Sequence, residues 1–464
     1  MPNTASAEPL TSGTEGRLAR RLGTLDASML VAGSIIGSGI FLVPGLVAGE
    51  VGAPGLSLLV WVVCGLLALC GALCFAELAS AIPHTGGTYP FLKHAYRNSA
   101  LPFLYAWSML FVVYTGAMAA VATAFSIYAG YFLGQWMAYT AWTQRLVAVG
   151  CILFLGVMNV VGVQIGGKIQ TIFTLIKVTA LLGIITVGLV FGVGGASHFT
   201  PFVSADSSAL DTLSAVGTAM ILALFAYNGW WMSSFIAGEV REPQLTIPRS
   251  IFIGMAIVIC TYLLVNVAYL YALPFSELQG STTVAADAMV SVVGPIGGGV
   301  VAAAVMISTF GTVNAQMLAY PRIYFALGED IGALRWLSGV HDRWRTPAVA
   351  ILLQTVWAAV LAVSGTYQQI VTYAAFPNYL FLSLAVAGVI ILRRTAPELP
   401  RPYRVWGYPA TPLLFLIVFC WYLVNSLVYR FDETLVGVLL MLSGLPVYAA
   451  WRLWERRRAQ AVTV

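Results

Sequence analysis

Long apolar stretches dominate this sequence of 464 residues, of which 59% are hydrophobic and only 9% are charged. A helix that crosses a bilayer needs about 20 mostly apolar residues, and only a helix or a closed barrel satisfies its backbone there. The sequence therefore predicts an all-α membrane protein with twelve transmembrane helices, of which the third and eighth are over-long. The predicted spans are 25–47, 56–81, 100–134, 145–164, 169–194, 211–236, 248–273, 288–327, 347–364, 367–392, 411–428 and 433–452.

The basic residues are divided very unevenly between the two sides of these spans. Twenty of the 23 Lys and Arg fall on the side of the termini, Arg145 and Arg430 fall on the other, and Lys177 lies inside the fifth span. Because cytoplasmic loops carry the excess of Lys and Arg, we expect both termini to be cytoplasmic in a multi-pass protein of the cell membrane. Residues 1–24 and 453–464 are then cytoplasmic tails, and no signal-peptide pattern precedes the first span.

The remaining ionisable residues exclude several classes of protein. All 18 acidic residues lie in tails, loops or near span ends, such as Glu50 and Glu77, so the carboxylates expected of sodium symporters and cation channels are missing from the predicted mid-membrane region. The six cysteines lie in apolar spans without a C-x-x-C motif, and no His, Asp or Cys cluster marks an enzyme. We expect small molecules and the lipid bilayer as partners, with no nucleic acid, metal or cofactor.

Two of the predicted spans are interrupted. The first contains GSIIGSGIF at 33–41, whose glycines each destabilise a helix by roughly 1 kcal/mol relative to Ala. Such glycines indicate either close helix packing or an unwound backbone that lines a polar cavity. The sixth span contains FAYNGWW at 225–231, five spans later. This pairing favours the second interpretation and predicts an inverted repeat, 25–194 and 211–392, in the leucine-transporter-like fold, with 411–452 as two additional helices.

Segments along almost the whole chain resemble the amino acid–polyamine–organocation superfamily, and within it the L-type amino acid transporter family. They include GSIIGSGIF at 33–41, GGKIQTIFTLIKVTALL at 166–182, FAYNGWW at 225–231, EVREPQLTIPRSI at 239–251, STFGTVNAQ at 308–316 and RRTAPELPRPYRV at 393–405. The resemblance implies sodium-independent amino acid transport, usually by exchange. It also implies that backbone groups of the two interruptions bind the substrate's α-carboxylate and α-amino groups. The positions so implied are Ser34, Ile35, Ser38, Gly39, Ile40, Phe225, Ala226 and Asn228.

Further site residues have both a functional and a purely structural interpretation. Asn378 matches a position near the family's pocket, and Val113 on the third span is expected to line the cavity. Helix cross-linking and core packing, respectively, are the usual roles of such residues. Glu239 and Arg249 resemble gating charges or are exposed loop charges. Lys177 is predicted to donate hydrogen bonds to unwound carbonyls of the first helix and to a hydroxyl of the eighth. A proton-carrier role and a role in packing alone stay open as alternatives. Asn228 stands where many members have a second Gly, which leaves side-chain specificity undetermined.

The sequence thus favours an exchanger of neutral L-amino acids that works by alternating access. A proton-coupled symporter that uses Lys177 and a non-transporting amino acid sensor are the alternatives. Some animal relatives are joined covalently to a glycoprotein through a cysteine between spans three and four. The corresponding loop, 135–144, has no cysteine here, so the sequence predicts no covalent accessory subunit.

Overall fold

The computed structural model describes residues 23–82, 87–97, 99–161, 167–192, 194–203, 208–231, 240–341, 343–344 and 346–462, and the regular elements in these residues are helices. The first part of the chain forms α1 (Thr24–Ile35), α2 (Gly39–Val51), α3 (Pro54–Ala81), α4 (Thr88–Ala95), α5 (Leu101–Ser108), α6 (Tyr114–Leu133), α7 (Ala141–Val160), α8 (Gly167–Phe191) and α9 (Ala209–Ala226). The second part forms α10 (Pro243–Ala272), α11 (Phe275–Leu278), α12 (Val284–Ala319), α13 (Pro321–Asp330), α14 (Ala348–Ser364), α15 (Tyr367–Thr395), α16 (Ala410–Tyr429), α17 (Phe431–Leu442) and α18 (Gly444–Val462).

The described helices are those of a membrane protein. Nine are long and apolar enough to cross a bilayer, or ten if the bent pair Ala27–Ile35 and Gly39–Val51 counts as one span. The predicted spans 169–194 and 347–364 correspond to shorter apolar helices, Leu175–Phe191 and Ala348–Ser364. The all-helical membrane class is confirmed, and the count of twelve spans stays a prediction.

Both over-long spans contain local breaks that the sequence did not reveal. A turn of π-helix, Met109–Val113, joins α5 to α6. Such turns free backbone carbonyls and often lie at functional sites. Here the carbonyl of Phe111 accepts a hydrogen bond from Trp357 Nε1 at 2.6 Å. In α12, Gly294 has non-helical backbone angles and precedes Pro295, so the helix is kinked there.

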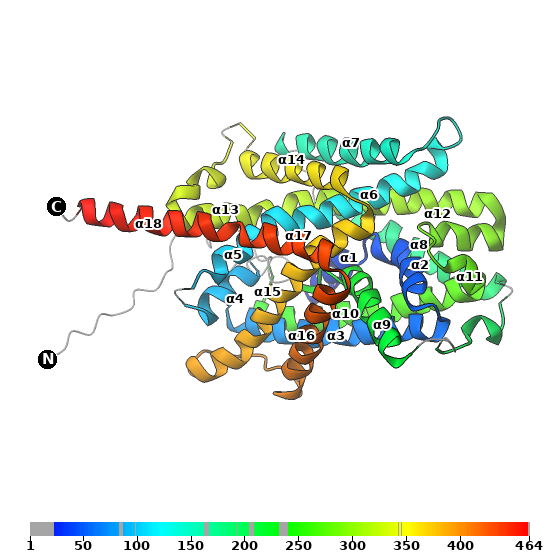
Figure 1. Ribbon diagram of the computed structural model, residues 1–464, viewed down its shortest axis with the longest axis horizontal. Helices are drawn as coiled ribbons and strands as arrows, with labels where there is room; N and C mark the ends of the chain where they lie inside the picture. The colour runs from blue at the N-terminus through cyan, green and yellow to red at the C-terminus, as the bar shows by residue number, and fades with distance from the viewer. Residues whose placement is uncertain are drawn as a thin grey trace.

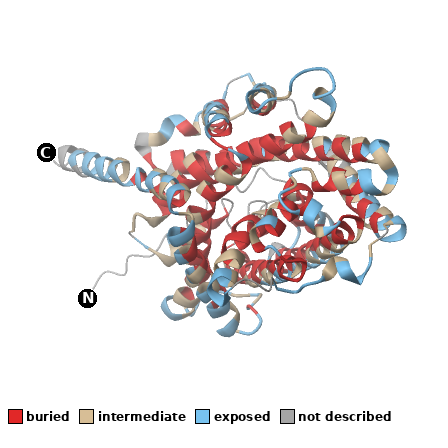
Figure 2. Ribbon diagram, turned by 45° about the vertical axis from the view of Figure 1, so that its right-hand side comes forward, coloured by how far each residue is buried: buried red, intermediate tan, exposed pale blue. Residues whose placement is uncertain are grey.

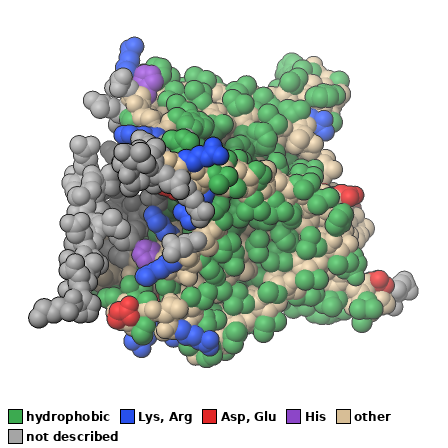
Figure 3. All heavy atoms as spheres, turned by 60° about the vertical axis from the view of Figure 1, so that its left-hand side comes forward, with side chains coloured by type: hydrophobic (Ala, Val, Ile, Leu, Met, Phe, Trp, Pro, Cys, Tyr) green, Lys and Arg blue, Asp and Glu red, His purple; other side chains and the backbone are tan. Residues whose placement is uncertain are grey.

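The helices form one bundle in which segments distant in sequence are neighbours (Figure 1). α2 packs against α9, α3 against α10, α6 against α12 and α7 against α14. Buried residues concentrate inside the bundle, whereas α18 extends beyond it and is largely exposed (Figure 2). In Figure 3, hydrophobic side chains cover most of the visible face, and Lys and Arg gather mainly toward one end. This distribution is that of a protein surrounded by lipid.

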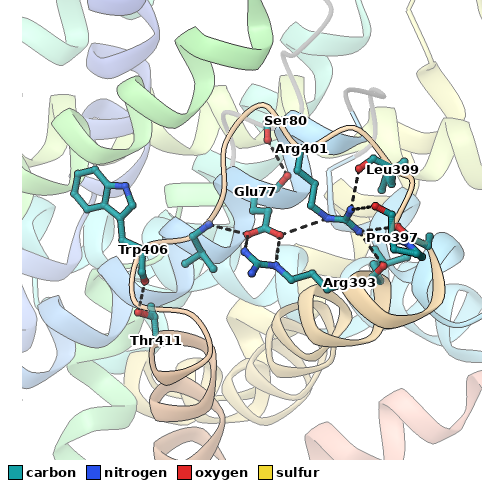
Figure 4. A network of polar contacts seen from close by, with 11 residues as sticks. Glu77, Ser80, Arg393, Pro397, Leu399, Arg401, Trp406 and Thr411 are labelled. Carbon is teal, nitrogen blue, oxygen red and sulfur yellow. Dashed lines mark hydrogen bonds and ion pairs between the residues drawn. The ribbon is translucent and has the colours of Figure 1, made fainter.

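A buried ion pair fixes the connection between α15 and α16 onto the end of α3 (Figure 4). Glu77 is 1% exposed and accepts hydrogen bonds from Arg393 Nε at 2.8 Å, from an Arg393 terminal nitrogen at 2.6 Å and from the Val405 amide at 2.7 Å. Arg401 Nε lies 3.7 Å from the same carboxylate, and its terminal nitrogens donate to backbone carbonyls of the connection. A buried carboxylate is tolerated because cations and an amide surround it.

We expect Glu77→Ala to destabilise the protein by about 3–5 kcal/mol, because the change leaves the guanidinium of Arg393 without its buried partner. Thermal unfolding of the purified protein in detergent would measure the effect. Glu455→Ala is the matched control, since Glu455 is 53% exposed and lies 3.9 Å from an exposed Arg452. Exposed pairs contribute about 0–1 kcal/mol. Equal shifts in the two variants would contradict a structural role for Glu77.

Candidate functional site

The two interrupted helices meet at their breaks. Residues 36–38 separate α1 from α2 with a bend of 42°, and α9 ends at Ala226, followed by a turn. The breaks approach so closely that only glycine fits at two places. A Cβ on Gly39 would lie 2.5 Å from the Cβ of Ala226, and one on Gly229 would lie 2.9 Å from the carbonyl oxygen of Ser34. The glycines therefore serve close packing and an unwound backbone together.

Lys177 satisfies carbonyls that the first break sets free. Its side chain is fully buried in α8, and Nζ donates to the carbonyl oxygens of Gly33 at 3.1 Å and Ile36 at 2.8 Å, and to Thr312 Oγ1 of α12 at 3.3 Å. These are the contacts that the sequence analysis predicts for it. An unpaired carbonyl in a lipid environment destabilises a protein by several kcal/mol, so this ammonium stabilises the broken helix.

Tyrosines of α10 satisfy further carbonyls in both breaks. The Tyr262 hydroxyl lies 3.1 Å from the carbonyl oxygens of Ile35 and Ala226, one from each break, and its proton bonds to either. The Tyr269 hydroxyl donates to the carbonyl of Ile40 at 3.3 Å. The sequence analysis missed both tyrosines. Their spacing of seven residues, which puts them on one helix face, was the available signal.

A cavity of about 230 Å³ lies where the two breaks meet, and α6, α12 and α15 complete its wall. Nine of the ten predicted substrate-binding residues line it: Ser34, Ile35, Ser38, Gly39, Val113, Phe225, Ala226, Asn228 and Asn378. Ile40 is buried but does not line the cavity. Among the described residues that line it, none is charged. The structure thus brings the predicted residues together, and their binding of a substrate stays a prediction.

The two predicted gating residues are not part of this cavity wall as described. Arg249 is exposed on α10 and does not line the cavity. Glu239 lies outside the described residues. Their gating role stays a prediction. Conversely, Gln316 of α12 lines the cavity, although it was singled out only as the last residue of the segment 308–316.

The helix ends around the cavity suit a small zwitterion. α2 begins at Gly39, and Ser38 before it makes no side-chain cap, so the first amides of α2 carry a partial positive charge toward the break. α9 also ends at the cavity, and its carboxyl end carries partial negative charge, whereas the carbonyls of Gly33 and Ile36 at the end of α1 already bond the Lys177 ammonium. A carboxylate is therefore favoured at one end of the site and an ammonium at the other, without charged side chains.

Comparison with known proteins places the chain among transporters. The amino acid permease family pattern matches residues 22–445. Human "Large neutral amino acids transporter small subunit 2" is 32% identical, over 98% of this chain and 84% of that protein. Human "b(0,+)-type amino acid transporter 1" is 33% identical, over 96% of this chain and 89% of that protein. "Serine/threonine exchanger SteT" of Bacillus subtilis is 31% identical, over 93% and 96% respectively.

The human relative named a small subunit corrects the expectation of no covalent accessory subunit. That expectation rested on the missing cysteine in the loop 135–144, and it is wrong, because a relative covering 98% of this chain is named as one subunit of a transporter. Physically, one absent cysteine excludes one covalent attachment, whereas subunits are held together mainly by buried surface. With a family match over 22–445 and relatives above 30% identity, the chain belongs to the amino acid permease family of the amino acid–polyamine–organocation superfamily, and it resembles the L-type transporters within it.

Proposed function

We propose that this protein is a sodium-independent exchanger of neutral amino acids that works by alternating access. The observation that carries the proposal is an uncharged cavity between two broken helices, backed by a buried ammonium. The names of its relatives, which include a transporter of large neutral amino acids and a serine/threonine exchanger, support the same function.

The geometry favours a neutral substrate and no coupling ion. Helix ends neutralise the α-carboxylate and α-ammonium, but no acidic side chain among the described lining residues would pair with a cationic side chain. Lys177 Nζ already bonds the carbonyls of Gly33 and Ile36, which a bound cation would otherwise coordinate. A second cation there would meet direct charge repulsion. The fixed ammonium therefore replaces an ion in holding the break.

We also infer the finer architecture of twelve spans, with repeats 25–194 and 211–392 and an appended pair at 411–452. In such a repeat each span has an equivalent five spans later. Four of these equivalent pairs pack on each other, namely α2 with α9, α3 with α10, α6 with α12 and α7 with α14, which supports a pseudo-twofold axis between the repeats. The distribution of Lys and Arg supports cytoplasmic termini.

A panel of labelled L-amino acids in proteoliposomes tests this function. Exchange predicts that uptake requires internal amino acid and does not respond to an imposed pH gradient. Uptake driven by the pH gradient into empty vesicles would establish proton-coupled symport instead. Saturable binding without counterflow would establish a sensor. Stimulation by sodium would contradict the role assigned to Lys177.

In the same assay we expect Ser38→Leu to lower exchange by about tenfold or more. The larger leucine side chain worsens the fit of the substrate in the cavity, and such a misfit weakens binding by about 1–3 kcal/mol. Ser38 is 2% exposed and lines the cavity. Ser364→Leu is the matched control, since Ser364 is exposed at the end of α14 and does not line it. Normal exchange by Ser38→Leu would show that the substrate binds elsewhere.

A further inference from the structure

Two carboxamides in the cavity wall have atoms without partners. Gln316 of α12 and Asn378 of α15 both line the cavity, and they are 9% and 3% exposed. Within the described part of the chain, Gln316 Oε1 and Asn378 Nδ2 are buried and have no hydrogen-bond partner. Buried polar atoms in native proteins are almost always paired, so these two atoms require an explanation.

Three neighbouring polar side chains of the same wall already have hydrogen-bond partners. Asn228 Oδ1 accepts a hydrogen bond from Tyr379 at 2.8 Å. The Thr312 hydroxyl accepts from Lys177 and donates to the backbone of α12. Tyr114 shares a hydrogen bond of 3.2 Å with Tyr105. Ser38 Oγ, in the first break, is a third lining atom that is buried without a described partner. The two unpaired carboxamide atoms differ from it in lying on α12 and α15, away from the backbone groups of the breaks.

The chemistry of the two carboxamides defines what they would bind. A carboxamide offers an acceptor at one end and donors at the other, and neither end carries charge. A ligand group such as a hydroxyl or a second carboxamide offers a donor for Gln316 Oε1 and an acceptor for Asn378 Nδ2. A methyl group of the same size satisfies neither and leaves them buried and unpaired.

We propose that Gln316 and Asn378 form the subsite for the substrate's side chain, and that this protein prefers neutral amino acids whose side chains end in a hydroxyl or a carboxamide over apolar amino acids of the same shape. The inference rests on the proposed function. It assigns the choice among amino acids to α12 and α15, while the broken helices bind the groups that all amino acids share.

Isosteric substrates test the preference in the unmodified protein. In proteoliposomes loaded with unlabelled serine, we expect threonine to exchange about tenfold or more faster than valine at equal low concentration, and asparagine faster than leucine. Exchange of valine and leucine at equal or higher rates would overturn the inference while the proposed function stands. If no amino acid exchanges, the proposed function itself fails.

Substitutions then assign the preference to the two residues. We expect Gln316→Met and Asn378→Leu each to bring the threonine-to-valine ratio close to one. The ratio is insensitive to the amount of folded protein, because misfolding lowers both rates equally. Gln354→Met is the matched control: Gln354 is fully buried, and its Oε1 also lacks a described partner, but it contacts Met317 and does not line the cavity. The assignment would be overturned if the threonine-to-valine ratio stayed unchanged in both cavity variants, or if Gln354→Met lowered the ratio as much as they do.

Discussion

Lys177→Met is expected to lower amino acid exchange by at least about a hundredfold, because it leaves three acceptors, the carbonyls of Gly33 and Ile36 and the hydroxyl of Thr312, without a donor at roughly 1–3 kcal/mol each. Methionine has nearly the same length but cannot donate a hydrogen bond. The carbonyls at the break would then be satisfied only by water or by rewinding of the helix, and both change the cavity. Exchange in proteoliposomes, with thermal unfolding in the presence of substrate, measures the effect.

The control for this prediction is Lys93→Met, which makes the same chemical change at an exposed position on α4. We expect its exchange to remain within about twofold of the unmodified protein, as is usual for surface substitutions. Wild-type exchange by Lys177→Met would show that the ammonium is not required to hold the break. A thermal shift without loss of exchange would limit Lys177 to folding.

Gly229→Ala is expected to lower exchange by about tenfold or more and to destabilise the protein, since a non-glycine residue in an unfavourable backbone conformation costs roughly 1–3 kcal/mol. Gly229 has φ = 119°, a conformation that L-residues rarely adopt. In addition, the new methyl group would lie 2.9 Å from the carbonyl oxygen of Ser34 and would push the two breaks apart. The same vesicle assay and thermal unfolding report both effects.

Gly150→Ala is the matched control, because a Cβ on Gly150 meets nothing within 4 Å and the residue lies inside helix α7. There the change should stabilise the helix by about 0.5–1 kcal/mol and leave exchange intact. If both glycine variants behaved alike, close approach of the two breaks would not explain the requirement for glycine at position 229.

The sequence predicted those features that depend on residues close together in the chain. Apolar length alone indicates a membrane helix, because an unsatisfied backbone is excluded from lipid. Three glycines at 33–41 and the Asn228-Gly229 pair at 225–231 indicated the two breaks, and a basic residue within an apolar span marked Lys177 as exceptional. The binding residues came mainly from the family resemblance, and nine of the ten line one cavity. The missing loop cysteine misled, because it says nothing about subunits held by packing.

What depends on contacts between distant residues was decided only by the tertiary structure. Tyr262 joins carbonyls of residues 35 and 226, and Glu77 joins groups more than 300 positions later in the chain. No local pattern specifies such partners, because a buried donor pairs with whichever acceptor the packing places beside it. The π-helical turn at Met109–Val113 was equally hidden in an uninterrupted apolar run.

The sequence by itself thus determined the membrane class, the two breaks and the residues that flank them, because composition and helix propensity act locally. Only the tertiary structure decided that the breaks touch through Gly39 and Gly229, and that Tyr262 bonds carbonyls of both breaks. It also decided that Gln316 and Asn378 face the same cavity with unpaired amide atoms. In a lipid environment buried polar groups need protein partners, and these come from other helices. The arrangement of the helices therefore determines which groups remain for a ligand.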